Sequence, residues 1–206
     1  MPKKKDLPEG WELYSIMGEQ VPGTKFIPFK VPLKEDLCRR KLSVDAWFTP
    51  HDLVRRIPKL KMVIDLTYTD GDRYYDQNIL REHNIAVVKI KCAGGPNEVP
   101  SRDLLQTFIA AVDNFLRSPA SRDGLIGVHC THGLNRTGYF ICKYMTDRMS
   151  VRPQRAIEDF EKARGHKISR PRLVADIMKS TSSFNPQSPL SNCYDDEGAS
   201  FSRFRR

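Results

Sequence analysis

The sequence lacks the features that mark several classes of protein: paired cysteine motifs, a long apolar run and an acidic surplus. Its five cysteines are irregularly spaced and include no CxxC pair, which argues against a disulfide framework or a zinc site and favours a reducing compartment. No apolar run approaches the roughly 18 residues that a membrane-spanning helix needs, so we expect no membrane partner. We also expect no secretion signal in these residues, because no apolar stretch follows the basic residues 3–5. Those residues are either a weak nuclear address or a solvated start.

Positive charge is what the sequence has in excess, with a formal net charge of +9 at pH 7 and a pI near 9.4. A basic balance favours acidic partners such as nucleic acids or phosphorylated ligands, without choosing among them. The length of 206 residues suits one domain with a tail. We predict a domain over residues 1–180, with an extended arm over about residues 1–30 laid across it. Residues 181–206 are rich in Ser and Pro and are predicted to form a disordered tail with a basic end.

Short apolar runs alternate with segments of helical periodicity. Strands are predicted where Val and Ile concentrate, and helices where apolar residues recur at helical spacing. The predicted strands are residues 61–67, 85–91 and 125–130, and the predicted helices are residues 101–118, 136–149, 153–165 and 171–179. Ser101 is expected to cap one helix and Gly165 to end another. The alternation predicts an α/β domain with a central, mostly parallel sheet flanked by helices.

The segment HCTHGLNRTG, residues 129–138, joins the last predicted strand to a helix. A tight loop at a helix N-terminus aims several backbone N–H groups at one point, and the helix dipole adds positive potential there. Gly133 lets the backbone turn, and Arg136 has the planar fork that binds two phosphate oxygens. Cys130 then lies at the floor of an anion site that favours thiolate, so we predict a lowered pKa for its thiol. We call residues 130–136 the Cys130 loop.

These groups predict a phosphate transfer in two steps. Cys130 attacks phosphorus to form a phosphocysteine, which water then hydrolyses. Arg136 and the backbone N–H groups hold the equatorial oxygens in both transition states, so neither a metal nor another cofactor is required. Thr137 is expected to hydrogen-bond the thiolate, and His129 to orient the loop from behind. The other residues expected to contact the bound phosphates are Thr131, His132, Gly133, Leu134 and Asn135.

The pattern H-C-x5-R-T-G resembles the signature of the cysteine-dependent protein-tyrosine and dual-specificity phosphatases. The five residues between Cys130 and Arg136, THGLN, are similar to those of one branch. This branch comprises the RNA 5′-triphosphatases of metazoan mRNA capping enzymes, their stand-alone relatives and a baculovirus RNA phosphatase. Other stretches agree, namely PGTKFIPFKVPL, VIDLTYT, RYY and AIEDFEKARGHKISR, so the resemblance covers roughly residues 8–180. It implies a dual-specificity phosphatase-like fold. The chain lacks the K-x-D-G of a guanylyltransferase domain, and resemblance to the stand-alone type implies removal of both γ and β phosphates to leave a 5′-monophosphate.

The leaving group bears on which phosphate is removed. In the resembling family, enzymes that act on phosphoproteins usually protonate the leaving oxygen from an Asp on a mobile loop. The corresponding residues 92–103 offer Glu98 and Asp103, but no Trp-Pro-Asp setting. A 5′-triphosphate releases a phosphate, which is far less basic than an alkoxide and needs little proton donation. The resemblance also implies that Asp65 supports activity, whereas the residues alone equally allow it to cap the turn after its strand.

An RNA substrate would need a basic approach to the Cys130 loop. Basic residues follow the predicted helix 153–165 and lie at or after strand ends, where such sites open. Together they could steer a polyphosphate and follow the RNA backbone, although each alone could be an ordinary solvated charge. They are Arg164, His166, Lys167, Arg170, Arg172, Lys89, Lys91 and Arg73. Tyr74 and Tyr75 are candidates either for stacking a terminal base or for core packing.

Three functions stay open on the sequence: an RNA 5′-tri- and diphosphatase, a dual-specificity protein phosphatase, and an RNA-binding module whose cleft only holds 5′ ends. The first two share Cys130 and Arg136, and the THGLN filling favours the first. Intact Cys130, Arg136 and Thr137 argue against the third. We expect the RNA 5′ end as partner, RNA-processing or ribonucleoprotein proteins as further candidates, and a monomer. The expected location is nuclear, with a cytoplasmic share as the alternative.

Overall fold

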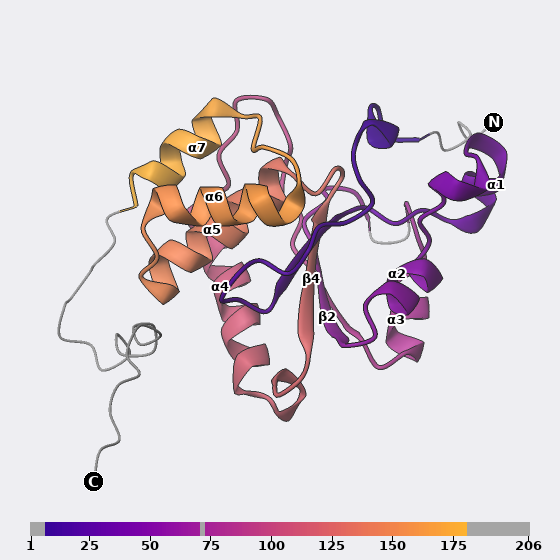
Figure 1. The fold of residues 1–206 in the computed structure, drawn as a ribbon, viewed down its shortest axis with the longest axis horizontal. Helices are drawn as coiled ribbons and strands as arrows, with labels where there is room; N and C mark the ends of the chain where they lie inside the picture. Colours follow the sequence, from indigo (N-terminus) through magenta and orange to yellow (C-terminus); the bar gives the residue numbers. More distant parts are fainter. Residues whose placement is uncertain (1–6, 71–72, 181–206) are drawn as a thin grey trace, which may run out of the picture.

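The computed structural model describes residues 7–70 and 73–180, so the predicted tail and the basic residues 3–5 lie outside the described residues. Four parallel strands form one sheet in the order β1-β4-β2-β3. They are β1 (Phe26–Lys30), β2 (Leu60–Asp65), β3 (Ala86–Lys89) and β4 (Leu125–Cys130). The last of these four strands in sequence, β4, therefore lies inside the sheet between β1 and β2 (Figure 1).

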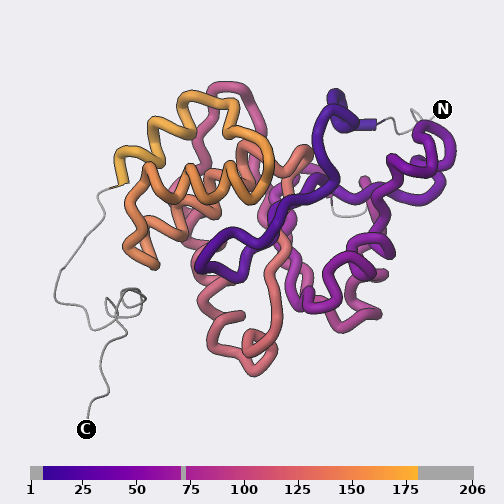
Figure 2. The backbone as a smooth tube through the Cα atoms, viewed as in Figure 1, coloured from indigo at the N-terminus to yellow at the C-terminus, as the bar shows by residue number. Residues whose placement is uncertain are grey.

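Helices cover both faces of this sheet. Figure 1 shows α4 to α7 on one side and α1 to α3 on the other, and the tube in Figure 2 follows the same layers. The helices are α1 (Glu35–Lys41), α2 (Pro50–Arg56), α3 (Asn78–Glu82), α4 (Arg102–Arg117), α5 (Asn135–Met149), α6 (Pro153–Arg164) and α7 (Pro171–Met178). The predicted α/β architecture is confirmed. In the part of the chain that the structure describes, no helix combines the length and apolar character needed to cross a membrane.

The core is divided in two by the alternation of side chains along the strands. Phe26, Ile126 and Val128 pack in a cluster with α4 to α7. Ile27 and Phe29 pack in a second cluster with α1 to α3. Because successive strand residues point to opposite faces, a strand covered on both sides must be apolar throughout. This is why LIGVHC could be predicted as a buried strand.

The predicted helices after residue 100 are confirmed, together with their ends. The Ser101 side chain accepts a hydrogen bond from the N–H of Leu104 and caps α4, and Gly165, at φ 74°, ends α6. The short helices α1, α2 and α3 were not predicted. They have seven, seven and five residues, which is too few turns for a periodicity to be recognised.

The first part of the chain differs from the extended arm that we predicted. Residues Phe26–Lys30 form an edge strand of the sheet, paired with β4 from Phe26↔Ile126 to Lys30↔Cys130. The sequence FIPFK hides this strand because Pro28 has no N–H to donate, a defect that only an edge strand tolerates. Upstream of β1, Trp11 is buried and its indole N–H donates to the Val31 carbonyl at 2.9 Å.

Candidate active site

Cys130 is the last residue of β4 and Asn135 is the first of α5, so the Cys130 loop lies at the carboxyl edge of the sheet. Ligands of open parallel sheets bind at this edge. The thiol is buried, and burial alone would raise its pKa. The Arg136 guanidinium, the hydroxyl and N–H of Thr137 and the N–H of Gly133 outweigh burial and lower the pKa of Cys130 below its usual value. The loop thus supplies the groups that stabilise the thiolate.

Thr137 carries a hydroxyl that acts on the sulfur of Cys130. Its Oγ1 is fully buried and has no hydrogen-bond partner among the described residues. An unpaired hydroxyl in a protein interior is costly in free energy. It is nevertheless one of the groups that lower the pKa of Cys130. The two observations agree if the thiolate is the acceptor that this hydroxyl lacks.

Gly133 allows the loop to close onto the edge strand β1. Its φ is +69°, and a Cβ at this position would lie 2.2 Å from the carbonyl oxygen of Phe29. Both features exclude an L side chain unless β1 moves. The Val31 N–H also donates to the Thr131 carbonyl at 3.1 Å, and Leu134 is buried beneath the loop. The edge strand therefore supports the Cys130 loop from one side.

The guanidinium of Arg136 is held by three acceptors of the protein. Its Nη1 donates to the carbonyls of Leu66 at 3.0 Å and Cys92 at 2.7 Å. Its Nη2 donates to the Thr131 hydroxyl at 3.1 Å. These bonds use both hydrogens of Nη1 and one of Nη2, so the Nε–H and the second Nη2–H remain for two oxygens of one phosphate.

Behind the loop, a buried histidine connects the nucleophile to the core. His129 Nδ1 lies 3.2 Å from the Cys130 carbonyl oxygen, and Nε2 lies 2.9 Å from the Tyr75 hydroxyl. Burial lowers the pKa of His129 more than nearby Asp65 raises it, so the ring is neutral at pH 7. Because a carbonyl only accepts, Nδ1 carries the proton and Nε2 accepts from Tyr75. Tyr75 is thus a core residue, which is one of the two roles that the sequence allowed for it.

Asp65 ends β2 beside this histidine, and its side chain is 2% exposed. One carboxylate oxygen accepts from the N–H and hydroxyl of Thr67, each at 2.8 Å. The other accepts from Lys89 Nζ at 2.9 Å. Burial raises the pKa of Asp65, but His129, Lys89 and Thr67 together lower it below its usual value. These are the contacts of a turn cap and a buried ion pair, which leave no carboxylate oxygen directed at a substrate.

Arg164 lies where the sequence did not lead us to expect it. We predicted it in a solvated basic approach, but the residue is 1% exposed. It donates to the carbonyls of Gly133 at 3.1 Å, His132 at 3.0 Å and Ser15 at 2.8 Å, and also to the Ser15 hydroxyl. The prediction of a surface role was wrong, because these acceptors compensate the desolvation of the charge. Burial lowers its pKa to about 10, so it stays charged at pH 7. We call this group of bonds the Arg164 clamp.

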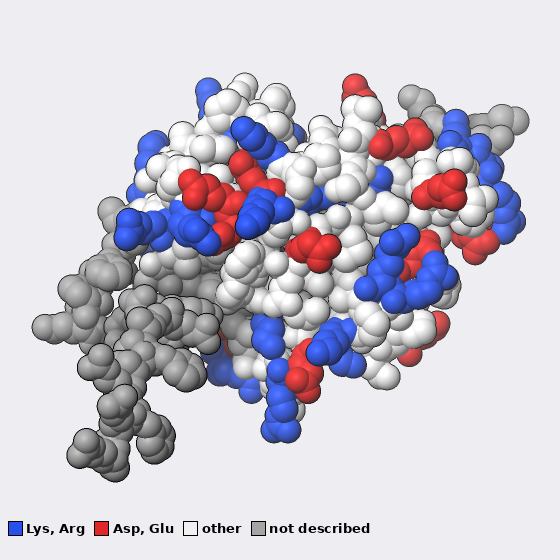
Figure 3. Space-filling view, in the orientation of Figure 1, with Lys and Arg blue, Asp and Glu red and all other residues white. Residues whose placement is uncertain are grey.

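The other predicted site residues mostly support the loop. The Asn135 side-chain oxygen accepts from the N–H of Arg170 at 3.1 Å. The Arg170 guanidinium donates to the carbonyls of residues 94 and 95, each at 2.8 Å. Arg172 donates to a carbonyl of the same segment at 3.3 Å, whereas Lys167 is exposed. On the face in Figure 3, basic and acidic side chains are interspersed rather than gathered in one patch.

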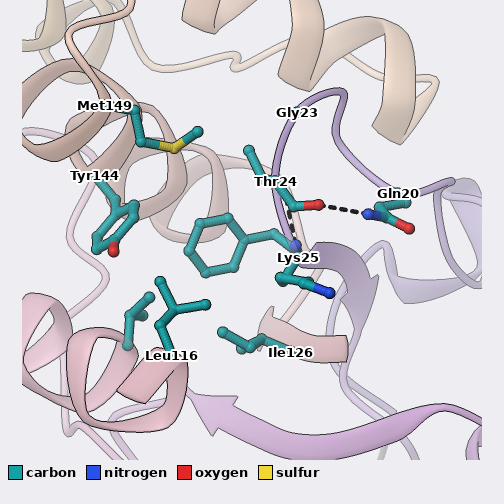
Figure 4. A pocket seen from close by; sticks show the side chains of 10 residues that line it. Gln20, Gly23, Thr24, Lys25, Leu116, Ile126, Tyr144 and Met149 are labelled. Carbon is teal, nitrogen blue, oxygen red and sulfur yellow. Dashed lines mark hydrogen bonds between the residues drawn. The ribbon is translucent and has the colours of Figure 1, made fainter. Parts of the chain in front are cut away.

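The described residues also form hollows away from the Cys130 loop. One hollow, of about 220 Å3, lies at the opposite edge of the sheet, beside Phe26 at the start of β1 and Ile126 near the start of β4 (Figure 4). Tyr144, Leu116 and Met149 also line it, and none of the predicted site residues does. Nowhere in the described ranges do three or more His, Cys, Asp or Glu side chains gather to hold a metal ion.

Comparison with known proteins agrees with this geometry. Residues 53–182 match the family described as "Dual specificity phosphatase, catalytic domain". The chain is 44% identical over 185 residues to the "RNA/RNP complex-1-interacting phosphatase" of Mus musculus, covering 86% of this chain and 56% of that protein. It is 36% identical over 171 residues to the "Tyrosine-protein phosphatase" of Autographa californica nuclear polyhedrosis virus, covering 83% and 98%. The chain therefore spans little more than half the length of the mouse relative.

Solved structures share the fold. The crystal structure of Tk-PTP in the active form superposes with a TM-score of 0.57 at 13% identity, covering 78% of this chain and 95% of that one. At this identity the likeness concerns the fold alone. The resemblance predicted from the Cys130 loop and the predicted fold class are both confirmed.

Proposed function

We propose that this chain, which belongs to the dual specificity phosphatase family, is an RNA 5′-polyphosphatase. It would remove the γ and β phosphates from 5′-triphosphate and 5′-diphosphate RNA and leave a 5′-monophosphate. One observation carries the proposal: Cys130 has a lowered pKa, yet among the described residues no carboxylate is hydrogen-bonded to the Cys130 loop. The name of the mouse relative, which refers to an RNA/RNP complex, supports the same class of partner.

The proposed chemistry begins with attack of the Cys130 thiolate on the terminal phosphorus. The S–P bond forms while the bond from phosphorus to the bridging oxygen breaks, and the RNA leaves with one phosphate fewer. Water then breaks the S–P bond, which releases inorganic phosphate and restores the thiolate. The free N–H groups of Arg136 and the backbone N–H groups of the loop bind the equatorial oxygens in both steps. Since these are all groups of the protein, the reaction is expected to proceed without a divalent metal.

The surroundings of the two candidate acids favour an anhydride substrate. Glu98 is exposed, and its carboxylate accepts from the N–H of Gly95 at 2.9 Å. Asp103 is exposed in the first turn of α4. An alkoxide or phenoxide leaving group needs a proton from such an acid, whereas a phosphate leaving group needs little. A site without a committed acid therefore suits 5′-polyphosphate ends better than phosphate esters.

We assign Asp65 a positioning role in this reaction. Its carboxylate fixes the turn at Thr67 and the ammonium group of Lys89, and lies 3.8 Å from His129 Nε2. His129 in turn bonds the carbonyl of Cys130. Asp65 would thus act on the nucleophile through His129 and not by proton transfer to the leaving group. The monomeric state and the nuclear location stay predictions.

The test is an incubation of a short 5′-triphosphate RNA with the protein in EDTA, beside Cys130→Ser and beside a phosphotyrosine peptide. Conversion to 5′-monophosphate that the variant lacks, and that is much faster than peptide turnover, is the expected result. A product that stops at 5′-diphosphate would restrict the activity to the γ phosphate. Fast peptide turnover with intact RNA would refute the proposal and leave a protein phosphatase.

A further inference from the structure

A polar hollow of about 580 Å3 opens beside the Cys130 loop. Its walls come from the N-terminal residues 7–10 with Tyr14, from Arg73 and Tyr74, and from Thr131 and His132. Because Thr131 and His132 directly follow the nucleophile, the hollow adjoins the proposed phosphate site. Its volume lies within the range of roughly 300–1,000 Å3 typical of small-ligand pockets. We call it the Tyr74 pocket.

We propose that the Tyr74 pocket binds the first nucleoside of the RNA substrate, the ribose and base that carry the 5′ phosphates. This inference rests on the proposed function and adds to it a second contact region. An enzyme that held only the phosphates would treat inorganic polyphosphate and RNA ends alike. An occupied nucleoside pocket would make the RNA end the better substrate.

Flat side chains suited to stacking line the pocket. The rings of Tyr14 and His132 lie with their centroids 5.1 Å apart, at 49° to one another. The Arg73 guanidinium lies 5.3 Å from the centroid of the Tyr74 ring. Unpaired bases stack on aromatic rings and on arginine planes of this kind. Whereas Tyr75 is buried in the core, the neighbouring Tyr74 is half-buried and faces the pocket.

His132 adds a hydrogen-bond acceptor to this wall. Its Nε2 lies 2.7 Å from the carbonyl oxygen of Glu9, and because a carbonyl only accepts, Nε2 carries the proton. Burial lowers the pKa of His132 more than this bond raises it, so the ring is neutral at pH 7. Its Nδ1 then has a lone pair with no partner among the described residues. A ribose 2′-hydroxyl or a base amino group could donate to it.

The lining of the pocket includes the acidic Glu9 and one basic residue, Arg73. Arg73 is exposed, and its guanidinium can turn toward the phosphate that joins the nucleoside to the cleaved groups. Arg136 already serves the reacting phosphate from within the loop. A chain of phosphates would therefore extend from Cys130 past Thr131 to Arg73, with the nucleoside at its end.

The experiment compares kcat/KM for a 5′-triphosphate RNA with kcat/KM for inorganic tripolyphosphate, which has no nucleoside. In Tyr74→Ala we expect the ratio of the two values to fall by roughly ten-fold or more, the usual loss of one stacked base. Tyr74→Phe keeps the ring and should keep the ratio. Tyr68→Ala is the matched control, because Tyr68 is 64% exposed and does not line the pocket.

A second substrate makes the test independent of any variant. The wild-type protein should cleave a 5′-triphosphate RNA whose first nucleotide lacks its base less efficiently, with a kcat/KM closer to that of tripolyphosphate. Suppose that RNA is cleaved, that removal of the base leaves kcat/KM unchanged, and that Tyr74→Ala leaves the ratio of the RNA value to the tripolyphosphate value unchanged. The nucleoside pocket is then refuted while the proposed function stands. If the wild-type protein leaves RNA intact, both proposals fail.

Discussion

The Arg164 clamp predicts that one buried side chain stabilises both the fold and the Cys130 loop. Arg164→Met keeps the volume of the stem and removes the donors. The carbonyls of His132 and Gly133 then lose their partner inside the protein, whereas Ser15 is exposed and can bond water. A buried acceptor left without a donor costs about 1–3 kcal/mol. The buried carbonyl of Gly133 therefore predicts a loss of about 1–3 kcal/mol in the free energy of unfolding, to which the part-buried carbonyl of His132 adds a smaller amount. Such a loss is a substantial part of the roughly 5–15 kcal/mol that is typical of a domain.

The assay is urea denaturation at pH 7, together with turnover of the 5′-triphosphate RNA used above. Arg155→Met is the matched control on the same helix, because Arg155 is exposed and its side chain bonds Asp159, at 2.8 Å, and no other residue in the part of the chain that the structure describes. It should change the free energy of unfolding far less and leave turnover intact. An Arg164→Met protein as stable as the Arg155→Met protein would refute the reasoning. A destabilised Arg164→Met protein would also refute it if the folded variant, measured without urea, turned over substrate as fast as the wild type. The Cys130 loop would then not depend on the clamp.

Three further outcomes follow from the geometry of the site. Arg136→Lys keeps the charge but loses the planar fork, so kcat on RNA should fall by about 10²–10³; an unchanged kcat would contradict the assigned contacts. Thr137→Val removes a donor that lowers the pKa of Cys130, so the pH midpoint of iodoacetamide alkylation should rise, and a profile that stays in place would exclude the hydroxyl. The pKa of Asp65 is lowered in the folded protein, so its stabilisation is present above the unfolded carboxyl pKa of about 3.9 and is lost as the pH falls through the folded value. Asp65→Asn should therefore be less stable than the wild type at pH 7, with the difference narrowing below about pH 4; a difference independent of pH would argue against the buried ion pair.

The parts of the site that the sequence predicted lie within one continuous segment. The strand 125–130, the turn at Gly133 and the helix that follows depend on residues close to one another in the chain, so their spacing carries the information. Contacts between distant segments were out of reach. Neither Tyr75 beside His129 nor Arg164 beside Ser15 can be found from spacing.

One signal for Arg164 was nevertheless present. It follows Ile157 and Phe160 on the same face of α6, at helical positions i, i+3 and i+7, and all three are buried. An arginine on an apolar face needs several acceptors around it, which indicates a structural contact rather than a solvated charge. Strand β1 was missed for a different reason, because Pro28 interrupts its pattern and only its position at the sheet edge makes the strand possible.

The place of β4 in the sheet has a consequence for how the protein is made. A ribosome delivers β1 and β2 well before β4, yet β4 is the strand that lies between them. Until residue 130 has left the exit tunnel, a nascent chain carries two strands whose facing edges are both unpaired, the kind of edge on which chains aggregate. The strand that fills this gap is also the one that ends in Cys130. Synthesis therefore delivers the nucleophile together with the strand that completes the sheet, and a nascent chain that still lacks β4 also lacks Cys130.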